Sequence, residues 1–230
     1  MRLLLIRHGR TPSNVHHLLD TAAPGADLDD VGREQAQALV ERLAGEHIGA
    51  INVSTAVRTQ QTAAPLATAL GLLPMVLHEG REVSAGTMEM SGRHEDVRDY
   101  VTTVFRWVSE DMGIVLAGDE TGTQVMERFE TQVDDACRRA AEAGAGVAVV
   151  IAHGAIIRFW TAARSEGADA TFIAFHPLGN TGIVEVEGEI GGPWRLVSFD
   201  GVSPADMQDG IPDILAASFA QDEREEHLGG

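Results

Sequence analysis

Lysine is absent from this sequence of 230 residues, and all 17 of its basic side chains are arginines. A Schiff base on a lysine amine and a phosphate loop of the Walker A type are therefore excluded, because both need that side chain. Any site for an anion must be built from arginine, histidine and backbone N–H groups.

Cysteine and long apolar runs are also scarce. Cys137 is the one cysteine, which excludes an intramolecular disulfide and agrees with a reducing compartment. The longest apolar run near the start covers residues 3–6, too short for a signal peptide or a membrane span. We therefore expect a cytoplasmic protein.

Positive charge is outweighed by negative charge, and the formal net charge is −18. A field of this sign repels nucleic acid and anionic membranes, so neither is an expected partner. It does not exclude a small phosphorylated metabolite, which responds to the local field of a pocket. The oligomeric state stays open, a homodimer included.

Short apolar segments alternate with segments of helical spacing, which predicts an α/β fold with a mostly parallel central sheet. We expect a three-layer α/β/α sandwich over residues 1–200, a small helical cap insertion over 79–122 and an acidic C-terminal tail over 201–230. The predicted strands cover 2–6, 50–53, 147–152, 182–187 and 194–199. The predicted helices cover 32–46, 56–70, 94–111, 123–143 and 155–163.

Two histidines each follow a predicted buried strand and precede a glycine: His8 before Gly9, and His153 before Gly154. Ligands of open α/β sheets bind at the carboxyl ends of the strands. Glycine lets the backbone approach a ligand closely. The helix that begins near residue 155 would aim free N–H groups at an anion there. The two imidazoles are therefore expected to face one crevice.

Arginines and an amide join the histidines at this sheet edge. Arg7 precedes His8, Arg58 lies in the first turn of the helix after the second strand, and Asn14 follows the first strand by a short loop. Guanidinium groups match phosphate oxygens in pairs. A phosphoryl group is the natural occupant of such a set.

In their order along residues 2–187, these motifs resemble the histidine phosphatase superfamily, the group that includes cofactor-dependent phosphoglycerate mutases. The matching residues are Arg7-His8-Gly9-Arg10-Thr11-Pro12-Ser13-Asn14; Leu28, Gly32, Gln35 and Ala36; Ser54, Arg58, Thr62 and Ala63; Arg81, Glu82 and Gly86; His153-Gly154 with Arg158; and Asn180-Thr181.

The resemblance implies a role for each member of the cluster. His8 attacks phosphorus and becomes a phosphohistidine, while Arg7, Arg58 and Asn14 hold the phosphoryl oxygens. His153 stabilises the charge of the transition state, and Gly154 lies beside the bound group. Attack requires a neutral His8, and the neighbouring guanidiniums are expected to lower its pKa.

The resemblance assigns the general acid and base to Glu82, by its spacing to Gly86. Glu79 and Glu89 lie close enough in sequence to be alternatives. The chain departs from the family at Met88, where an aromatic residue is usual near Glu89, so the substrate-side wall stays open. Arg10 is either a further cation at the pocket mouth or a solvated residue.

The leading hypothesis is a metal-independent phosphatase without a cofactor, which hydrolyses a small phosphomonoester through a phosphohistidine on His8. The adjacent histidines His16 and His17 diverge and lack a third ligand at a useful spacing, so no metal site is expected. The alternative is a cofactor-dependent phosphoglycerate mutase, which uses the same phosphohistidine. Residues 90–95 lack the Tyr-Gly pair usual in mutases, which favours hydrolysis. A non-catalytic phosphate-ester-binding protein is less favoured, because no catalytic position is missing.

Overall fold

The fold is a twisted sheet between two layers of helices. The computed structural model describes residues 1–117 and 119–207. Within them, seven strands form the main sheet in the order β3-β2-β6-β1-β8-β9-β7. Strands β1, β2, β3 and β6 run parallel, whereas β8 is antiparallel to both β1 and β9. The strands are β1 (Arg2–Arg7), β2 (Ile48–Ser54), β3 (Met75–Leu77), β6 (Val147–Ala152), β7 (Ser165–Glu166), β8 (Ile183–Gly188) and β9 (Trp194–Phe199).

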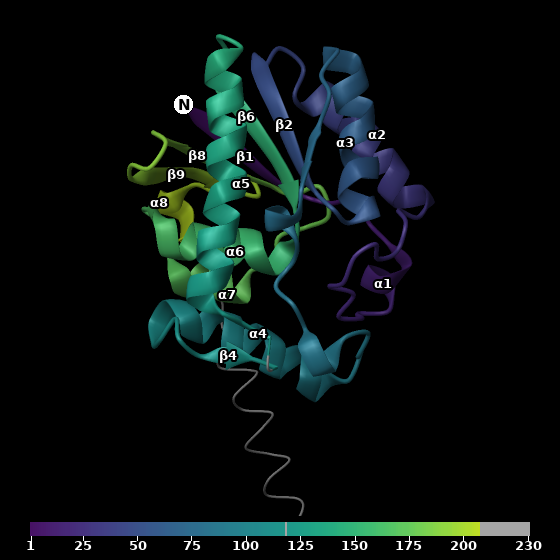
Figure 1. The fold of residues 1–230 in the computed structure, drawn as a ribbon, viewed down its shortest axis with the longest axis vertical. Helices are drawn as coiled ribbons and strands as arrows, with labels where there is room; N and C mark the ends of the chain where they lie inside the picture. The colour runs from purple at the N-terminus through teal and green to yellow at the C-terminus, as the bar shows by residue number, and fades with distance from the viewer. Residues whose placement is uncertain (118, 208–230) are drawn as a thin grey trace, which may run out of the picture.

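The two faces of the sheet bury alternate residues of each strand, because successive side chains point to opposite sides. Leu3 and Leu5 of β1 face the core beneath α5 (Gly122–Glu142) and α6 (Gly154–Arg164). Leu4 and Ile6 face the core beneath α2 (Asp30–Arg42) and α3 (Val57–Leu70). Figure 1 shows these helix pairs on opposite sides of the sheet. The predicted α/β/α fold with a mostly parallel sheet is confirmed.

Local signals in the sequence fix where the long helices begin and end. The Asp29 side chain accepts a hydrogen bond from Gly32 N at 2.7 Å and caps α2, as an N-cap aspartate does. Gly71 ends α3 in the left-handed conformation, with φ of 66°. Thr121 caps α5 through Gln124 N.

Several short elements lie outside the predicted set. They are α1 (Pro12–Val15), β3, η1 (His78–Gly80), η2 (Gly86–Met88), β4 (Val115–Leu116), β5 (Glu120–Thr121), β7, α7 (Ala170–Phe175) and α8 (Pro204–Met207). Most are too short to show a periodic pattern of apolar residues.

The segment between β3 and α5 extends past the carboxyl ends of the parallel strands, where α4 (His94–Ser109) and the β4–β5 pair lie (Figure 1). Helix α4 packs on α6, with the Trp107 and Phe159 rings 5.2 Å apart. Beyond β9, the expected tail is described only as far as residue 207, and residues 208–230 lie outside the described part. None of the described helices has the length and apolarity that a bilayer span requires.

Candidate active site

The structure brings His8 and His153 together at the carboxyl ends of two adjacent parallel strands. Strands β1 and β6 pair up to Arg7 and Ala152, and His8 N donates to Ala152 O at 3.0 Å. The two imidazole centroids are 5.3 Å apart and the rings are inclined at 64°. Both side chains are buried, at 4% and 1% exposure.

The hydrogen bonds of His8 define its neutral tautomer. Its Nδ1 lies 2.7 Å from Gly9 O, and a carbonyl can only accept, so Nδ1 carries the hydrogen. Its Nε2 accepts from Arg58 Nε at 3.2 Å. Burial, and then Arg58 and Arg7, hold the pKa of His8 well below its usual value of 6.5. The expected direction is confirmed, but burial rather than the guanidiniums is the largest cause.

His153 has one ring nitrogen bound by a serine and the other buried, with no partner that the structure describes. Its Nε2 lies 2.8 Å from Ser54 Oγ, which also accepts from Ala56 N at 3.2 Å. Its Nδ1 is buried and has no hydrogen-bond partner among the described residues. Burial is the largest cause that lowers the pKa of His153 well below 6.5, followed by Arg58. Ser54 Oγ also lies 3.0 Å from Thr59 Oγ1; in the tautomer in which its hydroxyl donates to Nε2, the hydrogen of His153 lies on Nδ1, free for an anion.

Both arginines are fixed by the backbone and keep one buried N–H unpaired. Arg58, 2% exposed, donates from Nη2 to Asp20 O at 2.9 Å, and its Nη1 lies 3.7 Å from Asp20 Oδ1 without a hydrogen bond. Arg7 donates from Nη1 to Leu178 O at 2.6 Å, and its Nε has no partner in the described part of the chain. A Cβ at Gly154 would lie 3.3 Å from this Nε, so the glycine leaves room beside Arg7.

Together these groups can hold a tetrahedral anion. Buried polar groups are nearly always satisfied, so the unpaired N–H groups of Arg7 and Arg58 call for an acceptor, as does His153 when its hydrogen lies on the unpaired Nδ1. Arg58 Nε contacts the His8 lone pair, and the His153 ring lies 5.3 Å from the His8 ring. Such donors, aimed where negative charge develops, are the usual means of stabilising phosphoryl transfer.

Asn14 and Arg10 differ in how they relate to this cluster. Asn14 Oδ1 accepts from Thr11 N and from Asn180 Nδ2, both at 3.1 Å, and Asn180 Nδ2 also donates to His8 O at 3.1 Å. Asn14 is thus tied to the backbone of His8, with its amide nitrogen left to bind an anion. Arg10 is ion-paired with Asp29 at 2.7 Å, not with the imidazoles.

Glu82 occupies the amino end of α6. Its carboxylate accepts from Ala155 N at 3.0 Å, Ile156 N at 2.9 Å and Val83 N at 2.9 Å. The prediction that the first N–H groups of α6 await a ligand is therefore wrong for this structure, because a carboxylate of the chain itself binds them. The cause is the partial positive charge of a helix amino end, which attracts any nearby anion.

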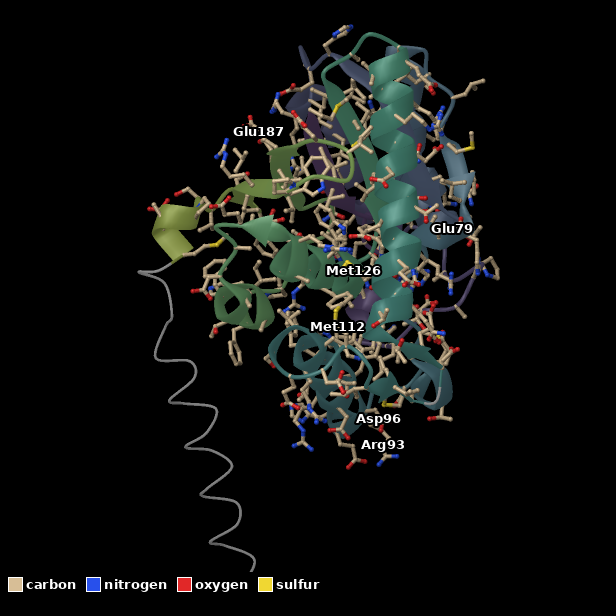
Figure 2. The ribbon with its side chains drawn as sticks, turned by 60° about the vertical axis from the view of Figure 1, so that its left-hand side comes forward. Glu79, Arg93, Asp96, Met112, Met126 and Glu187 are labelled. Atoms are coloured by element: carbon tan, nitrogen blue, oxygen red, sulfur yellow. The ribbon has the colours of Figure 1, made fainter. Side chains whose placement is uncertain are left out.

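The other two glutamates have different surroundings. Glu89 accepts from Thr21 N at 2.9 Å and Ala22 N at 3.1 Å, and its carboxylate also receives the Thr21 hydroxyl. It therefore holds the loop before α2. Glu79 is half-buried and lies at the outer edge of the molecule in Figure 2. Among the three, Glu82 is the one bound to the helix that follows His153.

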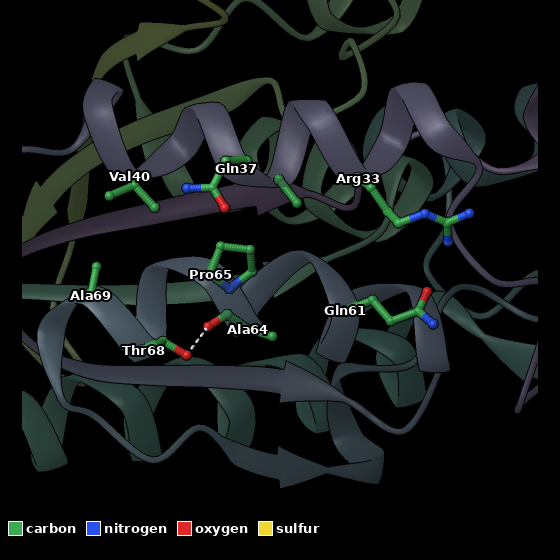
Figure 3. A pocket seen from close by; sticks show the side chains of 9 residues that line it. Arg33, Gln37, Val40, Gln61, Ala64, Pro65, Thr68 and Ala69 are labelled. Atoms are coloured by element: carbon green, nitrogen blue, oxygen red, sulfur yellow. Dashed lines mark hydrogen bonds between the residues drawn. The ribbon is translucent and has the colours of Figure 1, made fainter.

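A surface groove of about 700 Å³ between α2 and α3 contains none of the candidate site residues. Figure 3 shows Arg33, Gln37 and Val40 of α2 across it from Gln61, Pro65 and Thr68 of α3. The described residues hold no group of three or more histidine, cysteine or acidic side chains that could bind a metal ion. The buried cluster around His8 is thus the candidate active site.

Sequence reasoning missed three supports of this cluster: the Asp20 backbone under Arg58, the Ser54 hydroxyl as the partner of His153, and Arg128 beneath the Glu82 loop. Ser54 was visible as a motif position. The other two carried no signal, because their contacts join distant segments.

Comparison with known proteins gives the following matches. The family described as the histidine phosphatase superfamily (branch 1) matches residues 3–200. A PE-PGRS family protein, PE_PGRS11 of Mycobacterium tuberculosis, is 34% identical over 222 residues, which is 88% of this chain and 37% of that protein. Phosphoserine phosphatase 1 of Hydrogenobacter thermophilus is 29% identical over 145 residues, 60% of this chain and 65% of the enzyme. The matched regions thus cover less than two thirds of both relatives.

Solved structures with the same fold include a mycobacterial glucosyl-3-phosphoglycerate phosphatase. It superposes with a TM-score of 0.71 at 26% identity, over 88% of this chain and 99% of that chain. A phosphoserine phosphatase from Entamoeba histolytica superposes with a TM-score of 0.68 at 23% identity, over 86% and 96%.

Proposed function

Because the chain belongs to the histidine phosphatase superfamily (branch 1), we propose that it hydrolyses a small phosphomonoester through a phosphohistidine on His8. The observation that carries the proposal is the neutral His8, whose Nε2 lone pair faces Arg58 beside buried, unpaired donors. Nucleophilic attack on phosphorus requires a lone pair held in place beside donors that are free to bind the phosphoryl oxygens.

In the first transfer, Nε2 of His8 forms a bond to phosphorus as the bond to the leaving oxygen breaks. Glu82 enters this step as a carboxylic acid and gives its proton to the leaving oxygen. Arg7, Arg58 and His153 donate to the three equatorial oxygens, where charge gathers in the transition state. Asn14 adds an amide donor at the edge of the same group.

In the second transfer, water replaces the leaving group. Glu82, now a carboxylate, takes a proton from the water as its oxygen bonds to phosphorus, and the bond from phosphorus to Nε2 of His8 breaks. Glu82 Oε1 accepts two N–H bonds and Oε2 one, so Oε2 has the greater capacity left for this proton. Inorganic phosphate leaves and both residues return to their first state.

The surroundings of two arginines favour hydrolysis over the mutase reaction, in which the phosphoryl group is returned to the substrate and a bisphosphate is bound. Arg10 is paired with Asp29. Arg158 donates through Nε and Nη2 to carbonyls of Ile173 and Ala174 and lies over the Phe105 ring. These two cations are thus already engaged. A substrate with one phosphate suits the site better than a bisphosphate.

The proposed substrate is a small phosphorylated metabolite, which is supported by the similarity to a phosphoserine phosphatase and a glucosyl-3-phosphoglycerate phosphatase. We take the cytoplasm as the compartment, in line with the free, buried Cys137. Neither nucleic acid nor a membrane is a proposed partner, because the net charge is −18.

The test is phosphate release from a panel of phosphorylated metabolites and an aryl phosphate, in buffer containing EDTA. The wild-type chain should turn over, and a low but detectable amount of acid-labile, alkali-stable phosphoprotein should be found after rapid quenching in alkali. His8→Asn should lose turnover by at least roughly a thousandfold, as removal of a covalent nucleophile does, with an unchanged circular dichroism spectrum.

Three results would contradict the proposal. Wild-type turnover in His8→Asn would remove the nucleophile. Loss of activity in EDTA that zinc or magnesium restores would indicate a metallophosphatase. Conversion of 3- to 2-phosphoglycerate faster than phosphate release would make the protein a mutase.

A further inference from the structure

A buried arginine joins the loop that carries Glu82 to helix α5. Arg128, with 9% of its side chain exposed, donates from Nη1 to Glu79 O at 2.9 Å and to Arg81 O at 2.7 Å. Its Nη2 donates to Glu82 O at 3.0 Å. One guanidinium thus binds three carbonyls within four consecutive residues of the acid's own loop.

The other side of the same guanidinium is bound by a carboxylate. Arg128 Nε and Nη2 donate to the two oxygens of Glu120 at 2.8 and 3.0 Å. Glu120 belongs to β5 and also pairs with Arg81. Arg128 is therefore saturated, and its position is determined from both sides.

These contacts hold the backbone of Glu82, while α6 holds its carboxylate. The backbone carbonyl of Glu82 is bound by α5 through Arg128, and its carboxylate by Ala155 N and Ile156 N of α6. The next carbonyl, of Val83, accepts from the Tyr100 hydroxyl at 2.8 Å. The residue thus links two helices, α5 through its backbone and α6 through its side chain, and a shift at either end would move the carboxyl group.

The charge of Arg128 also reaches the site, where it is one of the causes that lower the pKa of His153. Burial lowers the pKa of Arg128, and Glu120 opposes the shift, so the cation is retained at a cost in desolvation. A buried ion pair is weak evidence for a purely stabilising role, because apolar packing often does as well. A role in fixing the carbonyls is the one that a guanidinium alone can fill, since it presents five donors in a plane.

We propose that Arg128 is a positioning residue, which sets the carboxyl group of Glu82 against the leaving oxygen; the inference rests on the proposed acid role of Glu82. Arg128 itself touches no reacting atom. Its removal should leave the phosphoryl cluster intact and impair protonation of the leaving group.

The experiment measures kcat/KM on phosphate esters whose leaving groups range from dinitrophenol to a simple alcohol. This parameter reports transfer to His8, the step in which the leaving group departs. Dinitrophenolate leaves without a proton, whereas an alkoxide needs one. Loss of a general acid therefore lowers kcat/KM most for the alkyl ester. We expect Arg128→Ala and Glu82→Gln to lose at least roughly tenfold more on the alkyl ester than on the dinitrophenyl ester.

The conservative variant and a control on the same helix sharpen the test. Arg128→Lys keeps the positive charge but loses the planar set of five donors. We expect it to show the same leaving-group dependence in weaker form. Arg138→Ala, on the exposed face of α5, removes pairs with Asp135 and Glu142 and should show no such dependence. If Arg128→Ala does not fold, the comparison is made with Arg128→Lys and Glu120→Gln.

The outcomes separate this inference from the proposed function. An equal loss on all esters in the Arg128 variants, beside a leaving-group dependence in Glu82→Gln, would make Arg128 merely structural and overturn the inference. No leaving-group dependence in Glu82→Gln would overturn the acid role, and the inference would fall with it.

Discussion

Arg58 Nε donates to His8 Nε2 across 3.2 Å, while Gly9 O accepts from the opposite nitrogen of the same ring. The two contacts hold the imidazole as the neutral tautomer with its lone pair on Nε2. A cation that donates to this lone pair also disfavours its protonation, and Arg58 is the second cause, after burial, of the lowered pKa of His8. Arg58 thus orients the proposed nucleophile and keeps it neutral.

The first prediction is that Arg58→Lys lowers kcat/KM by roughly 100-fold or more, since removal of one preorganised donor typically has an effect of this size. An ammonium group cannot replace Nε against His8 and Nη2 against Asp20 O together. Steady-state kinetics on an aryl phosphate measures the loss. Arg33→Lys, at an exposed pair with Asp30, is the matched control. Activity within a few-fold of wild type would contradict the role.

The sequence predicted the strand that precedes His153 to the residue, because 147–152 is an unbroken apolar run between glycine-rich and polar segments. It missed β3, whose three residues are mostly exposed at the edge of the sheet. It also missed α1, which is four residues long and held by a capping box between Thr11 and Asn14. Elements of this length depend on tertiary contacts rather than on a repeated pattern.

The same contrast holds for the site. The positions of His8, His153 and Arg58 were predictable, because the carboxyl ends of parallel strands meet at one sheet edge. The anchoring of Glu82 was not, since its partners on α6 lie 73 and 74 residues away and its own loop has no periodic pattern. The pairing of Arg10 with Asp29 likewise depends on how the loop after β1 meets the start of α2.

The second prediction concerns stability at acid pH. The pKa values of His8 and His153 lie well below 6.5 in the folded protein, with burial the largest cause. As the pH falls below 6.5, the unfolded chain takes up protons at these sites and the folded chain does not. Stability is therefore complete above this value and is lost below it, by about 1.4 kcal/mol per pH unit for each histidine.

Urea unfolding at a series of pH values from 7.5 to 5 tests this slope. His153→Asn should remove the contribution of one histidine, so that its stability falls less steeply than that of wild type as the pH drops. His94→Asn, on the exposed face of α4, is the matched control. Equal slopes in wild type and His153→Asn would mean that His153 is not held neutral.

The third prediction is that Ser54→Ala lowers kcat/KM by about tenfold and stability by about 1 to 3 kcal/mol, because it leaves a buried imidazole nitrogen without its partner. Ser54 is fully buried, and its hydroxyl lies 2.8 Å from His153 Nε2. Kinetics well below the melting temperature separates the two effects. Ser109→Ala removes an exposed hydroxyl bonded to Phe105 O and serves as the control. Unchanged activity in Ser54→Ala would mean that Ser54 does not determine the tautomer of His153.

The fourth prediction separates the acidic residues by kinetic signature. Glu89→Ala releases Thr21 and Ala22, next to Asp20, whose carbonyl orients Arg58. Because a mobile loop must be reordered by each substrate, we expect KM to rise about tenfold with a smaller change in kcat, the pattern of lost uniform binding.

Glu82→Gln should instead lower kcat/KM on alkyl esters, by roughly 100-fold or more, with the loss of a general acid. Glu79→Gln, at the outer edge of the molecule, should change neither. A larger loss in Glu79→Gln or in Glu89→Gln than in Glu82→Gln would transfer the acid to that residue and leave the carboxylate at the amino end of α6 with a structural role.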